Sequence, residues 1–320
     1  MKARDMTLNR RGLIAGAAAS LALPSAGLAA TPLQGNLRPW FWRFRIGAFE
    51  VTSILDGVVQ GDSMHPTFGQ NVTADDVAAL AEENFLPPAR FEAFFTVTLV
   101  NTGAELILFD TGNGEGRRPG RGRLIERLAE LGIAPGDITH VVITHFHPDH
   151  IGGMLENGEA AFPNAAYAMG AAEFDYWTTG DIPANRAGLV ALIESNVLPF
   201  AEQSRMVGPG DAVISGIEAI DGSGHTPGHM IYHLESEGER LAITSDTANH
   251  YVMSLQRPDW HVRFDMDKEA AAARRKEIFG MLAADRVPFI GYHMPPPALG
   301  YVEAMGDGFR YIPASYQLNL

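Results

Sequence analysis

The stretch from Thr144 to Gly153 gathers side chains that commonly bind metal ions. Four of them fall within six positions: His145, His147, Asp149 and His150. Imidazole nitrogen and carboxylate oxygen are ligands that Zn²⁺ and similar cations accept. Because four ligands this close together suit two ions better than one tetrahedral ion, the segment predicts a loop that binds a pair of cations.

Three further candidates lie later in the chain, each beside a short apolar run. His229 precedes the run 230–234, Asp246 follows 241–245, and His293 follows 287–292. Such positions are predicted strand ends or loops, where protein scaffolds commonly present catalytic groups. We expect all seven side chains to meet at one edge of a sheet.

The predicted chemistry is hydrolysis by a metal-activated water. A carboxylate such as Asp246 can bridge two cations about 3.5–4 Å apart, and such ions lower the pKa of a shared water to about 7. We expect the resulting hydroxide to attack an ester or lactone carbonyl, or the phosphorus of a phosphotriester. Asp149 is the candidate catalytic residue that passes a proton to the leaving group.

Apolar periodicity predicts the strands and helices that position these residues. Expected strands cover 42–46, 49–55, 95–101, 105–110, 140–143, 212–214, 217–220, 230–234 and 240–244. Expected helices cover 74–83, 122–131, 171–177, 186–196 and 267–284. Strands followed by helices in both halves predict an α/β fold with two sheets between helical layers, an αββα four-layer sandwich. No linker divides residues 31–320, which we expect to form a single domain.

In three motifs the chain resembles the metallo-β-lactamase fold superfamily. These motifs are Asp-Thr-Gly at 110–112, Thr-His-x-His-x-Asp-His at 144–150 and Pro-Gly-His at 227–229. Within the superfamily, segments between 246 and 267 look most like the branch that holds methyl parathion hydrolase and related lactonases or arylesterases. The resemblance spans about residues 42–311, and it implies the αββα fold and a dinuclear metallohydrolase.

Carried over by matching position, the resemblance also implies how two ions share the ligands. His145, His147 and His229 would bind the first ion, Asp149, His150 and His293 the second, and Asp246 both. Zinc suits these ligands best, with manganese, cobalt or iron as alternatives. Asp110 would lie beneath the metal loop and orient a ligand rather than bind an ion.

The substrate pocket is expected beside the metal loop. The candidate pocket residues are Phe146, Trp177, His250 and Trp260. The branch that the chain resembles uses an aromatic residue for its pocket at the position that matches Trp177. Packing in the core is the ordinary role of large rings and remains the alternative for each aromatic residue. For His250 the alternative is a hydrogen bond directed away from the substrate.

The first thirty residues predict an export signal. Lys2, Arg4 and the adjacent arginines 10–11 precede an apolar run at 13–23, and small residues follow through Ala30. This pattern is typical of a twin-arginine signal peptide, which implies a periplasmic protein with no membrane association after the signal is removed. A short helix of the mature fold is the alternative.

The composition restricts the partners. The formal net charge is −14, and it becomes −17 when residues 1–30, with four positive charges and one negative charge, are removed. A surface this acidic repels polyphosphate, so we do not expect nucleic acid as a partner. The chain contains no cysteine. A small ester or lactone is the expected substrate. The branch that the chain resembles often forms dimers, and the aromatic arm 40–42 is a candidate contact of such a homodimer.

Several alternatives remain open. Asp246 and the lack of cysteine oppose a true β-lactamase, and the segment 250–267 does not match a thioesterase of the glyoxalase II type. A periplasmic metal-binding or ligand-binding module without turnover is the alternative from another class, although the intact ligand set argues against it. The Gly/Arg-rich stretch 112–122 lacks the Lys-Ser/Thr ending of a phosphate-binding loop, so it predicts a mobile loop at the pocket rim.

Overall fold

The computed structural model describes residues 37–314, so the expected signal peptide at 1–30 lies outside the described residues. The chain divides into two units after Arg38, and every element below belongs to the second unit, Pro39–Leu320. Among the described helices, none combines the length and the apolar character that crossing a bilayer requires.

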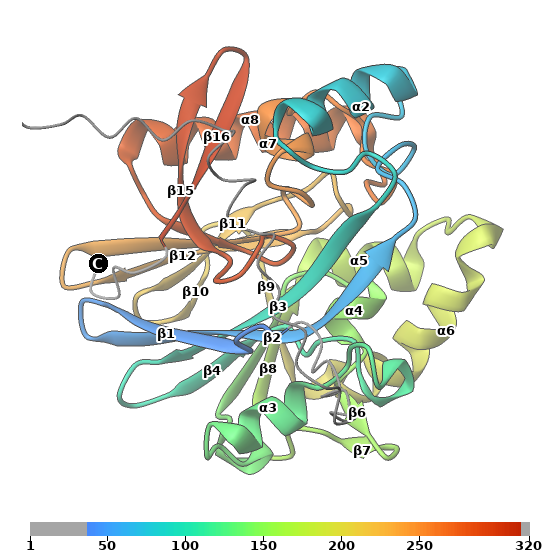
Figure 1. The fold of residues 1–320 in the computed structure, drawn as a ribbon. Helices are drawn as coiled ribbons and strands as arrows, with labels where there is room; N and C mark the ends of the chain where they lie inside the picture. The colour runs from blue at the N-terminus through green and yellow to red at the C-terminus, as the bar shows by residue number, and fades with distance from the viewer. Residues whose placement is uncertain (1–36, 315–320) are drawn as a thin grey trace, which may run out of the picture. The chain divides into compact units, whose positions relative to one another are not determined.

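Two seven-stranded sheets form the centre of this unit (Figure 1). In spatial order, the first sheet contains β1 (Phe41–Ile46), β2 (Phe49–Gly61), β3 (Phe91–Asn101), β4 (Leu106–Phe109), β5 (His140–Ile143), β8 (Ala166–Gly170) and β9 (Ser204–Val207). Strands β1 to β4 pair in antiparallel fashion, whereas β4, β5, β8 and β9 run parallel.

The second sheet keeps the chain order of its strands. It contains β10 (Ala212–Ile214), β11 (Ile217–Asp221), β12 (Met230–Ser236), β13 (Glu239–Ser245), β14 (Phe289–Gly291), β15 (Leu299–Met305) and β16 (Gly308–Pro313). Only the β13–β14 pair of this sheet is parallel. A separate two-stranded sheet consists of β6 (Leu155–Glu156) and β7 (Glu159–Ala160).

Helices cover the outer faces of both sheets. The α-helices are α2 (Ala74–Glu83), α3 (Leu124–Glu130), α4 (Pro148–Ile151), α5 (Ala171–Thr179), α6 (Ala187–Asn196), α7 (Met253–Gln256) and α8 (Lys268–Asp285). Four short 3₁₀ helices are η1 (Glu115–Arg117), η2 (Pro135–Asp137), η3 (Ala184–Arg186) and η4 (Leu198–Gln203). Figure 1 shows α2, α7 and α8 on the opposite side of the two sheets from α3, α5 and α6.

Alternation along the strands explains why the sheets bury both faces. In β5, Val142 joins a core that includes residues of the second sheet, whereas Val141 and Ile143 join a core that includes residues of α3, α5 and α6. Successive side chains of a strand point to opposite faces, so one short apolar run serves two cores. Phe279 of α8 belongs to the first of these cores and packs against Phe289 of β14. The predicted αββα sandwich is confirmed.

The predicted elements agree closely with the structure where the apolar pattern is regular. The helix 74–83 and the strand 140–143 are confirmed with the same bounds, and the longest helix, expected at 267–284, covers Lys268–Asp285. The sequence did not predict β8, β9 or the hairpin of β15 and β16. These strands belong to the framework rather than to the candidate site.

Candidate metal centre

The candidate ligands follow the carboxyl ends of parallel strands in both sheets. His145 comes after β5, Asp246 directly follows β13, and His293 follows β14. Because β13 and β14 are parallel neighbours, their ends lie side by side. The two sheets meet at this edge through a hydrogen bond from the Met230 amide to the Thr144 carbonyl, at 2.9 Å.

Two groups of side chains at this edge have the geometry to hold one cation each. The first group is His145, His147, His225 and Asp246, and the second is Asp149, His150 and His293. Within each group the candidate ligand atoms lie within 4.8 Å of one another. The structure therefore brings together six of the seven predicted ligands and adds His225.

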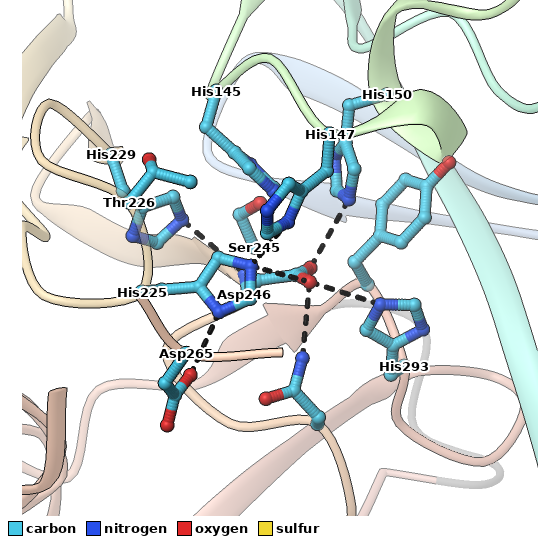
Figure 2. Close-up of polar contacts among 12 residues, drawn as sticks. His145, His147, His150, His225, Thr226, His229, Ser245, Asp246, Asp265 and His293 are labelled. Carbon is cyan, nitrogen blue, oxygen red and sulfur yellow. Dashed lines mark hydrogen bonds and ion pairs between the residues drawn. The ribbon is translucent and has the colours of Figure 1, made fainter. Parts of the chain in front are cut away.

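Asp246 lies between the two groups (Figure 2). Its Oδ2 atom is 3.3 Å from Nε2 of His225 and 3.0 Å from Nε2 of His293, while its Oδ1 atom is 3.3 Å from Nε2 of His150. One carboxylate thus reaches imidazoles of both groups, which is the arrangement that a bridging ligand needs.

His229, which the sequence analysis assigned to the first ion, belongs to neither group. Its Nδ1 atom donates to the carbonyl of Gly222 at 2.8 Å, and its Nε2 atom accepts from the amide of Asp246 at 3.4 Å. Both nitrogens therefore contact backbone groups, whereas those of His225 contact side chains, including His147 of the first group. His225 belongs to the first group instead, and its Nε2 atom lies 2.9 Å from Nδ1 of His147. The motif Gly-His-Thr-Pro-Gly-His contains both histidines, and sequence reasoning chose the second.

Buried atoms without partners show that this donor set fits cations. His145 Nε2, His150 Nε2 and Asp246 Oδ1 are buried and have no hydrogen-bond partner among the described residues. Leaving a buried polar atom unpaired costs about 1–3 kcal/mol, so such atoms at a native site imply a missing partner. Imidazole nitrogens and carboxylate oxygens converging on one point suit borderline divalent cations such as zinc.

The far nitrogens of the imidazoles are held by other groups. His150 Nδ1 lies 2.8 Å from Asp110 Oδ2, and His293 Nδ1 donates to the carbonyl of Phe94 at 2.7 Å. Asp110 also accepts hydrogen bonds from the amide and hydroxyl of Thr144. Such contacts fix the tautomer and the ring orientation of a metal-binding histidine. Asp110 therefore lies where the sequence placed it, beneath the metal loop.

Burial and neighbouring charges set the protonation states of the group. Burial lowers the pKa of His145 well below its ordinary value and that of His147 to about 3, so both rings are neutral near pH 7. Burial alone would also lower the pKa of His225, but hydrogen bonds to Asp246 and Asp265 outweigh it and raise that pKa to about 9. Burial opposes ionisation of Asp246, yet His293 and His150 hold its pKa well below the usual range.

Glu173 connects the two histidine loops through hydrogen bonds, and no sequence pattern indicated this role. Its Oε1 atom accepts from the Phe146 amide at 3.0 Å and from Trp177 Nε1 at 2.9 Å. Its Oε2 atom accepts from the Thr226 hydroxyl at 2.7 Å and from the Gly228 amide at 2.9 Å. The carboxylate is fully buried, and each oxygen has two donors.

A cavity of about 840 Å³ opens onto both ligand groups. Four candidate ligands form part of its lining: His147, Asp149, Asp246 and His293. Its apolar wall includes Phe68, Phe91, Phe95, Leu189 and Phe264. A cavity of this size beside the candidate ions is the expected place for a small substrate.

The four predicted pocket residues do not line this cavity, and two of them serve the core instead. Phe146 is fully buried. As the residue between two histidines of an extended segment, it points away from them and into the core. The indole of Trp177 is also buried and donates to Glu173, so it supports the metal loop from behind.

His250 and Trp260 are likewise engaged elsewhere. Nδ1 of His250 accepts from the amides of Val252 and Met253, and its ring stacks on Tyr251. Trp260 packs in a separate core cluster that includes Phe68. None of the four predicted pocket residues therefore lines the cavity. Each has instead the structural role that was its alternative in the sequence analysis.

Comparison with known proteins agrees with this geometry. Residues 96–289, more than half of the chain, match the Metallo-beta-lactamase superfamily. "Metallo-beta-lactamase domain-containing protein 1" of Xenopus laevis is 31% identical over 138 residues, which are 42% of this chain and 46% of that protein. "N-acyl homoserine lactonase" of Bacillus sp is 24% identical over 157 residues, 49% of this chain and 57% of the lactonase. The match thus spans about half the length of these relatives.

Solved structures match over most of the chain. AidC, described as a dizinc quorum-quenching lactonase in complex with a product, has a TM-score of 0.79 and 25% identity, covering 86% of this chain and 98% of that one. Hydrolase AbOPH in the beta lactamase superfamily has a TM-score of 0.82 and 24% identity, covering 88% and 99%. The likeness to AidC agrees with the predicted resemblance to lactonases. By its fold and by the family match over residues 96–289, the chain belongs to the metallo-beta-lactamase superfamily.

Proposed function

We propose that the protein is a dinuclear metal-dependent hydrolase of esters or lactones. The observation that carries this proposal is the pair of ligand groups that share Asp246 at the wall of a cavity large enough for a small substrate. The likeness to AidC supports a lactone as the substrate, since that protein is described as a dizinc lactonase in complex with the product N-hexnoyl-L-homoserine.

The ligands divide between two cations in this proposal. His145, His147 and His225 would hold the first cation, Asp149, His150 and His293 would hold the second, and Asp246 is placed to serve both. Bound divalent cations supply Lewis-acid polarisation of a carbonyl and a lowered pKa for water, which is the chemistry that hydrolysis of a lactone needs. Zinc is the expected metal because it accepts both imidazole and carboxylate ligands.

Asp149 is the residue that we propose to carry the proton to the leaving group. It lines the cavity, and its side chain is 20% exposed. Burial raises the pKa of Asp149, but His150 outweighs this effect and the pKa is about 2. The carboxylate is therefore ionised near pH 7 and acts as a proton acceptor before it acts as a donor. The Tyr292 hydroxyl positions this residue through a hydrogen bond to its carbonyl.

Other activities of the same fold rank behind lactone or ester hydrolysis. A thioesterase is the second candidate, because "Hydroxyacylglutathione hydrolase" of Erythrobacter litoralis is 33% identical over 113 residues, 34% of each chain. Phosphotriester cleavage is proposed only as a secondary activity. We also propose export to the periplasm, which the sequence of residues 1–30 supports, and a homodimer, for which the arm 40–42 is the candidate contact.

The test is hydrolysis by protein loaded with zinc. The substrates are 4-nitrophenyl acetate, N-hexanoyl homoserine lactone, S-lactoylglutathione and paraoxon, each with and without a chelator. We expect chelator-sensitive turnover that is fastest on the lactone or the ester. Turnover that is fastest on the thioester would favour the second candidate. Inactivity on all four substrates, with two zinc ions bound per chain, would overturn the proposal in favour of a binding module.

A further inference from the structure

The cavity beside the ligand groups is rich in arginine. Its lining includes Arg117, Arg121, Arg186 and Arg263, and the described residues of this lining include neither lysine nor glutamate. Outside the candidate metal ligands, Asp62 is the one acidic residue of this lining. The whole chain has 38 acidic against 24 basic residues, so this local balance is opposite to that of the protein as a whole.

None of these four arginines forms an ion pair with a carboxylate among the described residues. They come from three separate parts of the chain: the loop before α3, the 3₁₀ helix η3, and the segment before α8. Arginines elsewhere, such as Arg118 and Arg274, do pair with nearby carboxylates. Four arginines without a carboxylate partner among the described residues, from three segments, therefore line one cavity.

Arg121 is linked to the candidate metal centre through one aromatic ring. Its guanidinium carbon lies 5.4 Å from the centre of the Phe95 ring, and that ring packs edge-on against His293 at 5.5 Å. The Nε atom of Arg121 is buried and has no hydrogen-bond partner among the described residues. A buried donor without a partner, one aromatic ring away from a candidate ligand, is a donor available to a bound molecule.

Asp56 holds the loop that carries Arg117 and Arg121. Its buried carboxylate accepts hydrogen bonds from the amides of Asn113, Gly122 and Leu124, at 2.9–3.0 Å. The Val58 amide also donates to the carbonyl of Gly120. The sequence predicted a mobile loop at the pocket rim; the loop does lie at the rim, and these bonds anchor it. A fixed loop can present its arginines in a defined place.

We infer that the substrate of the proposed hydrolase carries a carboxylate, or a comparable anionic group, outside its scissile ester or lactone. This inference rests on the proposed function and names the substrate class of the same site. Arg121 is the principal contact of the anionic group, and the three other arginines attract it toward the cavity against the negative charge of the remaining surface. The aromatic wall receives the apolar part of the substrate.

Two matched esters test the inference. Mono(4-nitrophenyl) suberate and its methyl ester share the scissile bond and differ by one negative charge. For the zinc-loaded protein we expect kcat/KM to be about tenfold higher for the anionic ester, chiefly through KM, because a charge-assisted hydrogen bond contributes about one factor of ten. The preference should shrink as salt rises toward 1 M, where screening acts within about 3 Å.

Three variants test whether the arginines cause the preference for the anionic ester. Arg121→Gln should reduce the preference several-fold, and the variant with all four arginines changed to Gln should abolish it. Arg45→Gln, which removes the same charge from an exposed position on β1, should leave it unchanged. A preference that survives in the four-arginine variant would overturn the inference, because the carboxylate would then be bound by something else, such as the cations.

A binding measurement keeps the two proposals distinguishable. Suberate monoanilide and its methyl ester replace the ester with an amide, and calorimetry with the zinc-loaded protein gives their affinities without ester turnover. We expect the anionic anilide to bind about tenfold more tightly. Equal affinities, or equal kcat/KM for the two nitrophenyl esters, would overturn the inference and leave the hydrolase intact. Tight anion binding without any hydrolysis would support the inference and count against the proposed function alone.

Discussion

Asp265 contacts His225, the histidine that stands in the first ligand group where the sequence predicted His229. Its Oδ1 atom lies 2.8 Å from Nδ1 of His225, and its Oδ2 atom accepts from Arg275 Nη2 at 2.7 Å (Figure 2 shows the first contact). The side chains of Asp265 and Arg275 are both fully buried. Because Arg275 belongs to α8, the longest helix fixes the orientation of His225 through one carboxylate.

Asp265→Asn should weaken both the metal site and the fold. We expect cation affinity to fall about 10–100-fold, since His225 loses the group that orients it. The free energy of unfolding should fall by about 3–5 kcal/mol, because the buried charge of Arg275 loses its partner. Competition with a chelating dye and urea unfolding measure the two effects. The control is Asp285→Asn, whose pair with Arg240 is exposed, and an equal response of both variants would contradict the role of Asp265.

A matched pair of variants distinguishes the two histidines of the Gly-His-Thr-Pro-Gly-His motif. In His225→Asn and His229→Asn, the amide nitrogen can replace Nδ1 as a donor, but nothing replaces Nε2. We expect His225→Asn to retain about one zinc ion per chain and His229→Asn to retain two, as measured by elemental analysis after dialysis. The reverse outcome would return His229 to the ligand set.

Cation binding should release protons. The pKa of His225 is raised to about 9, since its hydrogen bonds to Asp246 and Asp265 outweigh burial, and a metal ion needs the neutral ring. Zinc affinity should therefore increase from pH 7 to pH 9. Calorimetry at pH 7 in two buffers with different ionisation heats should show proton release, and identical heats in both buffers would contradict this assignment.

The same raised pKa affects the stability of the metal-free protein. The protonated ring stabilises the fold, so this contribution is fully present below about pH 6.5, the ordinary value for histidine, and is lost as pH rises through about 9. Urea unfolding of the metal-free protein at pH 6.5 and pH 9 measures it. His150 and His293, whose pKa values are also raised by neighbouring carboxylates against the effect of burial, contribute in the same direction, so His225→Asn should reduce that difference without abolishing it.

Glu173→Gln should destabilise the protein although the two side chains have the same shape. Each oxygen of Glu173 accepts from two donors, and an amide NH₂ in place of one oxygen would face two of these donors. Burying unpaired donors costs about 1–3 kcal/mol each, so we expect a loss of at least about 2 kcal/mol in chemical denaturation. The exposed Glu202→Gln is the control, and equal stabilities would exclude the proposed link between the histidine loops.

Most of the ligand set could be predicted because it follows from local sequence. His145, His147, Asp149 and His150 belong to one short loop after a strand, and Asp246 and His293 each end an apolar run. The choice between His225 and His229 depends on how the loop before β12 turns, which places one ring toward Asp246 and the other toward Gly222. Nothing in the spacing of the motif determines that turn.

The pocket could not be predicted because it depends on tertiary contacts. Trp177 is near the metal loop in space, but its partner Glu173 draws the indole into the core. The arginines of the cavity come from segments far apart in the chain, and only the fold brings them together. Among the framework strands, β8 was missed since its sequence, Ala-Tyr-Ala-Met-Gly, has weak strand propensity and pairs only with the distant β5 and β9.

Elemental analysis, combined with removal and return of the metal, tests the dinuclear site most directly. We expect two divalent transition-metal ions per chain, loss of lactone or ester hydrolysis on chelation, and recovery of both metal and activity on adding zinc. Protein that binds no stoichiometric metal even after zinc is supplied, or that hydrolyses its substrate equally well without metal, would contradict the dinuclear mechanism.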